Sequence, residues 1–311
     1  MVDDTKESLE HNTSEVRKIT ILGLFVNFFL TILKIVIGLF GKSSSVVADG
    51  FHSLSDCSTD IAVIIGVKYW NKEPDEDHPY GHRRIEAMVS SFIAIALASV
   101  GFFLIYESIT KIHNAVYNNG IYQIPEWSTF WIAIISIITK EILYHKTARK
   151  AVELKSPSLL ANAWHHRSDA FSSIPVALAI GFTKYNESWA ILDPIASVVV
   201  SFFILQAAYM ISKPALLELS DSGASEISVA KIKEIATSVE GVQSVHGIRT
   251  RYHGNGLHVD LHIQVDPDLT VREGHEIAGH AKRHLLEDGP EVIDVLVHLE
   301  PGEPRKENKN V

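Results

Sequence analysis

The segment ITILGLFVNFFLTILKIVIGLF, residues 19–40, is an almost unbroken apolar run near the start of the chain. A helix of about 20 apolar residues is what crosses the roughly 30 Å hydrocarbon core of a bilayer. Residues 1–16 are polar and acid-rich, and they lack the basic segment and short apolar core of a secretion signal. We therefore expect residues 1–16 to form a cytoplasmic N-terminal tail, followed by a first membrane span that stays in the protein.

Five further segments have the length of a membrane span, namely residues 45–70, 85–112, 128–144, 159–182 and 189–211. The second and fifth of the six spans are less apolar, because each carries acidic and imidazole side chains. They are still predicted to be helices, since a helix satisfies its own backbone hydrogen bonds in lipid. Residues 17–211 are thus expected to form an all-α membrane domain, a six-helix bundle.

The basic residues of the short loops predict the orientation of these spans. On one side the loops and the segment before the first span carry Arg17, Lys18, Lys72, Arg83, Arg84, Lys146, Arg149, Lys150 and Lys155. The loops on the other side hold only Lys42, Lys111 and Lys184. Cytoplasmic loops are the ones enriched in basic residues, so both termini are expected in the cytoplasm of a multi-pass protein of the cell (inner or plasma) membrane.

Composition narrows the possible partners and the possible ligand chemistry. The chain has 311 residues and a mean hydropathy of +0.12, and its net charge of −9 argues against a nucleic-acid partner. A single cysteine, Cys57, excludes a thiolate metal cluster within one chain. The 16 histidines are numerous for this length, and imidazole suits zinc and its neighbours in the first transition row.

The last third of the chain has the pattern of a separate domain. Residues 226–239 and 271–286 are predicted as helices, and residues 242–252, 257–265 and 292–299 as strands. The order α-β-β-α-β is typical of a small two-layer α+β domain. We expect this cytoplasmic domain to span residues 212–303 and the charged residues 304–311 to form a disordered tail.

Two of the predicted spans contain a histidine and an aspartate four residues apart. The pairs are His52 with Asp56, and His165 with Asp169. Side chains at this spacing share one face of a helix, so two such helices can offer two imidazoles and two carboxylates to a tetrahedral ion such as zinc. The alternative is that these groups only hydrogen-bond to each other, but charged side chains in a span are costly and are by default functional. Asp49, one turn before His52, is a candidate partner of the ligands.

Other polar residues of the spans are interpreted as structural. His166 points away from His165 and is expected to make a hydrogen bond within the bundle. Lys34 and Lys140 are expected to make polar contacts between helices rather than to bind metal.

Three motifs, in this order, carry a resemblance to a known family. They are SVVADGFHSLSD at residues 45–56, HPYGH at residues 78–82 and AWHHRSD at residues 163–169. The chain resembles the cation diffusion facilitators over nearly its whole length. The resemblance implies a homodimer of six-helix protomers, each with a cytoplasmic ferredoxin-like domain, which exchanges metal for protons by alternating access.

The resemblance also implies where metal binds during transport. The family's transport site corresponds to His52, Asp56, His165 and Asp169. A histidine at position 52 is similar to zinc-selective members, whereas the stretch WHHRSD resembles members that handle iron or manganese. Zn²⁺ is therefore the expected cargo of an efflux transporter, with Fe²⁺, Mn²⁺, Co²⁺ and Cd²⁺ as alternatives.

Two further metal sites and one ion pair follow from the same resemblance. A loop site corresponds to Asp75, His78 and His82, although loops rich in such residues are often only solvated. A site at the dimer interface of the cytoplasmic domain, with zinc in a structural role, corresponds to His246, His262, His275, His298 and Glu300.

Arg84 and Glu218 stand where relatives place a charge pair. His253, His258 and His280 have no counterpart and are expected to be exposed.

Two other classes of function compete with a transporter. A membrane metalloenzyme such as an intramembrane hydrolase usually carries His-Glu-x-x-His on one helix, and this motif does not occur in the sequence. No catalytic or cofactor-binding residue is predicted, so an enzyme is not expected. A membrane scaffold that senses metal without moving it is the remaining alternative, and the complete set of four transport ligands argues against it.

Overall fold

The computed structural model describes residues 2–70, 72–117, 123–154, 156–254 and 256–303. The predicted disordered tail, residues 304–311, lies outside the described residues. The chain divides into two compact units. One comprises Met1–Ile65 with Phe92–Ser212, and the other comprises Gly66–Ser91 with Lys213–Val311. The second unit therefore contains the loop between the second and third helices as well as the C-terminal domain.

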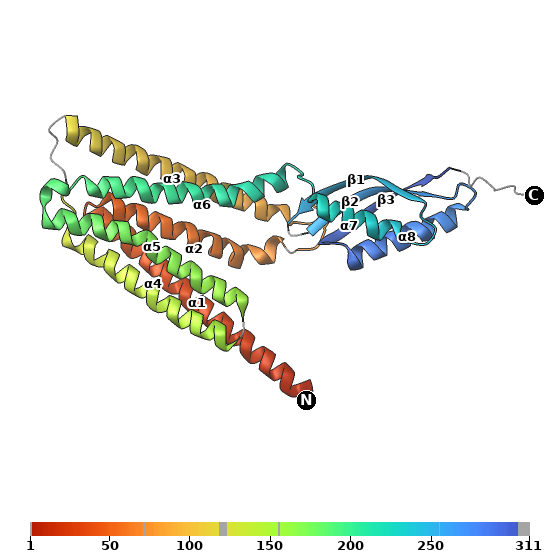
Figure 1. Cartoon of the computed structure of the whole chain (residues 1–311), viewed down its shortest axis with the longest axis horizontal. Helices are drawn as coiled ribbons and strands as arrows, with labels where there is room; N and C mark the ends of the chain where they lie inside the picture. The colour runs from red at the N-terminus through yellow and green to blue at the C-terminus, as the bar shows by residue number, and fades with distance from the viewer. Residues whose placement is uncertain (1, 71, 118–122, 155, 255, 304–311) are drawn as a thin grey trace, which may run out of the picture. The chain divides into compact units, whose positions relative to one another are not determined.

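Six long helices form where the sequence predicts membrane helices (Figure 1). They are α1 (Val2–Phe40), α2 (Ser44–Trp70), α3 (Arg84–Tyr117), α4 (Trp127–Glu153), α5 (Pro157–Tyr185) and α6 (Leu192–Leu219), with a short 3₁₀ turn η1 (Glu187–Trp189) before α6. The helical prediction is thus confirmed for all six segments. Helix α1 also runs through most of the segment that was expected to be a tail.

Four of these helices are long and apolar enough to cross a membrane by length and composition. The qualifying segments are Lys18–Phe40, Arg84–Tyr117, Trp127–Glu153 and Glu187–Leu219. Helices α2 and α5 do not reach this level, because they carry the acidic and imidazole side chains noted above. The number of six spans therefore stays a prediction, while a helical membrane region is evident.

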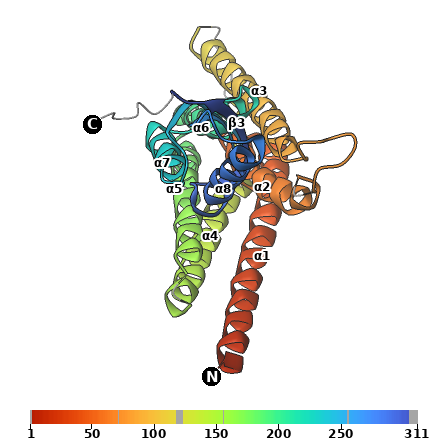
Figure 2. The ribbon, with the colours of Figure 1, turned by 90° about the vertical axis from the view of Figure 1, so that its right-hand side faces the viewer.

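The first unit exposes large apolar side chains on its outside and buries charged side chains as well as an apolar core, which is the arrangement expected in lipid. Phe40 and Phe92 are 81% and 74% exposed, whereas Lys34 and Asp49 are at most 1% exposed. Helices α4 and α5 run side by side in both views (Figures 1 and 2). The polar side chains are thus collected in the interior of the helix bundle.

The start of α2 is fixed by a buried carboxylate on α6. Asp193 accepts hydrogen bonds from the backbone N–H of Ser44 at 2.8 Å and from the hydroxyls of Ser43 and Ser45 at 2.6 Å. An acid at this position satisfies N–H groups that the first turn of a helix leaves without partners. Further along α2, Gly50 lets the helix approach α1, since a Cβ there would lie 2.7 Å from Ile35. These contacts set the position of the turn that carries His52.

The C-terminal domain has the predicted α-β-β-α-β order. Its elements are α7 (Glu226–Thr237), β1 (Ser244–His253), β2 (Gly256–Val265), α8 (Val271–Asp288) and β3 (Val292–Pro301). The sheet order is β1-β2-β3, with β2 antiparallel to β1 and parallel to β3. Ile232, Leu261, Ile263 and Leu285 are fully buried in one core between the helices and the sheet. The predicted α+β fold class is confirmed.

Candidate metal-transport site

The His-Asp pairs of α2 and α5 meet in the interior of the first unit. His52 and Asp56 on α2 and Asp169 on α5 each present a ligand atom within 4.8 Å of the others. Asp169 is 4% exposed, and Nδ1 of His52 is buried with no hydrogen-bond partner among the described residues. A buried ring nitrogen without a partner is costly unless something binds it. The three side chains therefore form a candidate metal site.

His165, the fourth expected ligand, is not part of this group of three. Its side chain is 49% exposed, and its Nδ1 lies 3.8 Å from Oδ1 of Asp169. It does line the same cavity of about 610 Å³, together with His52, Asp56 and Asp169 and with side chains of α6 that include Phe203 and Gln206. His165 thus lines the cavity without joining the group of converging ligand atoms.

Two lysines that sequence reasoning treated as simple polar contacts lie directly behind the site. Nζ of Lys140 on α4 is 3.3 Å from Oδ2 of Asp169, and both side chains are at most 5% exposed. Nζ of Lys34 on α1 is 2.8 Å from Oδ2 of Asp49. Asp49 is thus the ion-pair partner of Lys34 and lies outside the group of converging ligand atoms. The sequence signal was present, because a lysine in an apolar span requires a nearby acid.

His166 does not make the hydrogen bond expected of it. Its side chain is 3% exposed, and neither ring nitrogen has a hydrogen-bond partner among the described residues. The ring packs against α1 at Gly23, where an added Cβ would lie 3.0 Å from Nε2. The reason is steric: the small residue on α1 leaves room for the ring but offers no side chain to bond with it.

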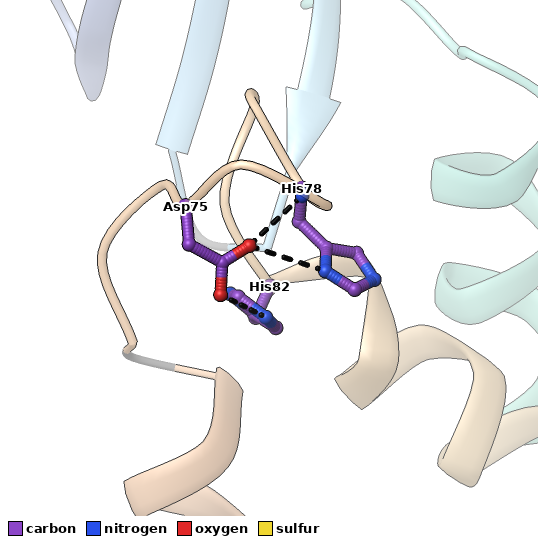
Figure 3. Close-up of side chains that lie close together, drawn as sticks. All are labelled: Asp75, His78 and His82. Carbon is purple, nitrogen blue, oxygen red and sulfur yellow. Dashed lines mark hydrogen bonds and ion pairs between the residues drawn. The ribbon is translucent and has the colours of Figure 1, made fainter.

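The loop between α2 and α3 brings its three predicted ligands together (Figure 3). Oδ1 of Asp75 lies 3.4 Å from Nδ1 of His78, and Oδ2 lies 3.5 Å from Nε2 of His82. The backbone N–H of His78 also donates to Asp75, at 2.9 Å. A hydrogen bond from Lys72 holds the pKa of the Asp75 carboxyl below its usual range. The carboxylate is therefore available to a cation that replaces Lys72.

Four of the five residues predicted for the cytoplasmic site form a second cluster. His246, His262 and His298 are register partners across β1, β2 and β3, so their side chains stand in one row. Glu300 lies beside the row, with Oε1 2.7 Å from Nδ1 of His262 and Oε2 3.2 Å from Nε2 of His246. The hydrogen bond with His262 lowers the pKa of Glu300.

The fifth residue, His275, is exposed on α8 and is not among the three residues whose ligand atoms converge there. That group consists of His246, His262 and Glu300. Side-chain exposures of 48% for His246 and 58% for His298 leave imidazole nitrogens open to a metal ion. The donor set of imidazoles and one carboxylate fits zinc.

Comparison with known proteins shows which family this chain belongs to. The cation efflux transmembrane domain matches residues 20–220, and the cytoplasmic domain of cation efflux proteins matches residues 224–302. This chain belongs to the cation diffusion facilitator family. As a member with several apolar helices, it is a multi-pass membrane protein. The family is one of transporters, which agrees with the expectation that the protein is not an enzyme.

Three similar proteins illustrate the range of this family. An uncharacterized transporter of Methanocaldococcus jannaschii is 36% identical over 92% of this chain and 98% of its own. The manganese efflux system protein MneP of Bacillus subtilis is 28% identical over 92% of this chain and 96% of its own. A solved structure of the MamM CTD in a nickel form is 30% identical, covers 25% of this chain and all of its own, and has a TM-score of 0.25.

The charge pair expected in this facilitator between Arg84 and Glu218 is not formed within the protomer. Arg84 pairs with Asp221 instead. Glu218 accepts the backbone N–H of Gly254 at 2.7 Å. The reason lies in the chain path: Asp221 follows the end of α6 with a φ of 56°, and this turn directs its carboxylate to Arg84.

Two histidines of the facilitator that were expected to be exposed are buried. His253 is 6% and His258 is 9% exposed, and their rings lie 5.2 Å apart. They line a cavity of about 520 Å³ with Tyr80 and Arg251. Burial lowers the pKa of His253 to about 4. Strand periodicity does not predict this burial, because it depends on the loop and turn residues that line the cavity with the two histidines. His280 is exposed as expected.

Proposed function

We propose that this facilitator exports a divalent transition-metal cation across the cell membrane through a site formed by His52, Asp56, His165 and Asp169. The observation that supports this most is the convergence of ligand atoms of His52, Asp56 and Asp169 inside a helix bundle. Two carboxylates at this depth are costly unless a cation balances them. His165 lines the same cavity and completes the set when its side chain turns inward.

Zinc is the cargo that the full ligand set favours. Two imidazole nitrogens and two carboxylate oxygens make a tetrahedral site that Zn²⁺ accepts without a preference from its d electrons. The cation must also leave the site, so its affinity has to remain moderate. A cavity that reaches the ligands from α6 is compatible with such exchange.

Manganese is the second candidate, and two observations favour it. The three ligands that converge supply one nitrogen and two oxygens, and oxygen-rich sets suit Mn²⁺. The relative from Bacillus subtilis is named as a manganese efflux protein. Iron, cobalt and cadmium remain alternatives that the same ligands accept. A competition between metals therefore has to decide the cargo.

Proton antiport is the proposed source of energy. A protonated imidazole has no lone pair for metal, so a proton and a metal cannot share one ring nitrogen. An imidazole that releases a metal ion can accept a proton in its place, which would couple the two movements at His52 and His165. Metal would enter from the cytoplasm, the helices would rock, and protons from the other side would displace the metal.

We further propose that residues 17–211 form the membrane domain and that two copies assemble through the cytoplasmic domain, residues 212–303. The cluster of His246, His262, His298 and Glu300 supports this, because its exposed imidazoles can share a metal with a second copy. The match to a cytoplasmic domain and the basic loops both support cytoplasmic termini. The loop group of Asp75, His78 and His82 is proposed as an additional metal site.

Uptake into proteoliposomes with an imposed pH gradient tests the proposal. Vesicles would be offered Zn²⁺, Mn²⁺, Fe²⁺, Co²⁺ and Cd²⁺ separately and in competition. We expect saturable flux of Zn²⁺ or Mn²⁺ that the pH gradient drives and that Asp56→Ala abolishes. Glu153→Gln, which alters an exposed acid on α4, is the matched control and should transport normally. Metal binding without any flux would instead favour a sensor.

A further inference from the structure

A buried ion-pair network joins four helices directly behind the proposed transport site. Lys34 on α1 pairs with Asp49 on α2, and Lys140 on α4 pairs with Asp169 on α5. Ser53 connects the two ion pairs, because its hydroxyl accepts a hydrogen bond from Nζ of Lys34 at 3.2 Å and another from Nζ of Lys140 at 3.4 Å. All four charged side chains are at most 5% exposed. Each ammonium therefore has one carboxylate partner within 4.0 Å, in a region shielded from water.

The two pairs differ in their relation to the metal ligands. Asp49 is outside the converging group, and its Oδ2 accepts both Lys34 at 2.8 Å and the hydroxyl of Ser173 at 2.8 Å. Asp169 is one of the three converging ligands. Its Oδ2 makes no hydrogen bond among the described residues and has the Lys140 ammonium at 3.3 Å. Oδ1 of Asp49 also lacks a hydrogen-bond partner among the described residues, so the difference is that the Lys140 pair alone shares its carboxylate with the converging ligands.

We infer that Lys140 is an internal counter-cation of the transport site, which balances Asp169 when the site is empty and weakens the binding of metal when it is filled. This inference rests on the proposed function, since it requires cargo to bind Asp169. It assigns Lys140 a role in setting the affinity and release rate, as a positioning residue that does not itself bind the metal.

The balance of charge gives the physical reason. In the empty site, the buried carboxylate of Asp169 needs a cation nearby, and Lys140 supplies it. A bound divalent metal is neutralised by Asp56 and Asp169 together, so the Lys140 ammonium becomes an excess positive charge beside the ion. Repulsion between these cations is strong where water is excluded. Lys140 therefore lowers metal affinity and favours release, which a transporter requires.

Removal of this charge without removal of a ligand tests the inference. Lys140→Met deletes the ammonium and shortens the unbranched side chain by only one heavy atom, and Lys140→Arg keeps the charge. The control is Lys34→Met/Asp49→Asn, which neutralises both members of the other pair. Zn²⁺ and Mn²⁺ binding would be measured by calorimetry on the full-length protein in nanodiscs. The part of the metal-binding signal that is lost in Asp56→Ala would be assigned to the transport site.

We expect Lys140→Met to bind metal about tenfold more tightly at the transport site, and to show both a lower KM and a lower kcat in vesicles. Lys140→Arg and the control pair should bind metal as the wild type does. A merely structural lysine would instead give unchanged or weaker binding in Lys140→Met, and either result overturns the inference. If Asp56→Ala binds metal with the same signal as the wild type, no binding belongs to the transport site, and the proposed function itself fails.

A second measurement covers the case in which Lys140→Met is too unstable for titration. Bound cargo should then replace the missing charge beside Asp169 and stabilise the variant more than the wild type. Thermal unfolding with and without Zn²⁺ would show this as a larger metal-induced rise in Tm. An equal or smaller rise than in the wild type contradicts the inference.

Discussion

The carboxylate of Asp169 on α5 and the imidazole of His52 on α2 present ligand atoms within 4.8 Å of each other, although they belong to different helices. Asp169 is held from behind by Lys140, with 3.3 Å between Oδ2 and Nζ. Asp169 thus has two roles, as a proposed metal ligand and as one half of a buried ion pair. The two roles can be separated by mutation.

Asp169→Asn should abolish metal transport and also destabilise the bundle. The loss of one carboxylate leaves Lys140 as an unpaired buried cation, which costs about 3 kcal/mol or more. Lys140→Met/Asp169→Asn should recover most of the stability, because neither charge remains, but it should recover no transport. Chemical unfolding in detergent and vesicle flux measure the two effects. A double variant as unstable as the single one would show that the pair is not the cause.

His52→Asp should broaden the metal selectivity of the transporter rather than stop transport. The change replaces a nitrogen ligand by an oxygen ligand, and a set made of oxygens suits Mn²⁺ better than zinc. We expect the ratio of manganese to zinc transport to rise by about tenfold, as measured in competition assays. An unchanged order of metals would show that selectivity depends on other residues. His145→Asp, at an exposed position on α4, is the matched control.

The stability of the cytoplasmic domain should fall in mild acid because of His253. Burial lowers the pKa of this imidazole to about 4, whereas an unfolded chain binds the proton near its ordinary value of about 6.5. Between these values the unfolded state holds more protons, so stability is complete above about pH 6.5 and is lost as the pH falls toward 4. Urea unfolding at several pH values measures this. His253→Gln should flatten the slope, whereas His280→Gln should leave it unchanged.

The segment of residues 212–311 should fold alone and dimerise more tightly with zinc. Its core of Ile232, Leu261, Ile263 and Leu285 is self-contained, and the histidine row on the sheet leaves donor atoms open. Metal that bridges two copies would link binding to association. Light scattering with and without Zn²⁺ measures the mass, and His246→Ala/His262→Ala should remove the metal effect. A monomer at all zinc concentrations would contradict the prediction.

Local spacing made part of this structure predictable from the sequence. The interval between His52 and Asp56 places both on one helix face whatever surrounds them, and the alternation in β2 and β3 defines the small domain. The partners of Lys34 and Lys140 depend on which helices pack together, and periodicity carries no such information. The same holds for Arg84, whose partner Asp221 is set by a turn with positive φ after α6.

Simultaneous recording of metal and proton movement in one vesicle population is the most direct test of metal export coupled to protons. Wild-type protein and Asp56→Ala would be reconstituted with one metal-sensitive and one pH-sensitive dye, and a zinc or manganese gradient would be imposed. We predict proton movement opposite to metal movement in the wild type and neither in Asp56→Ala. Metal flux without proton movement, or equal flux in the variant, would contradict the proposed mechanism.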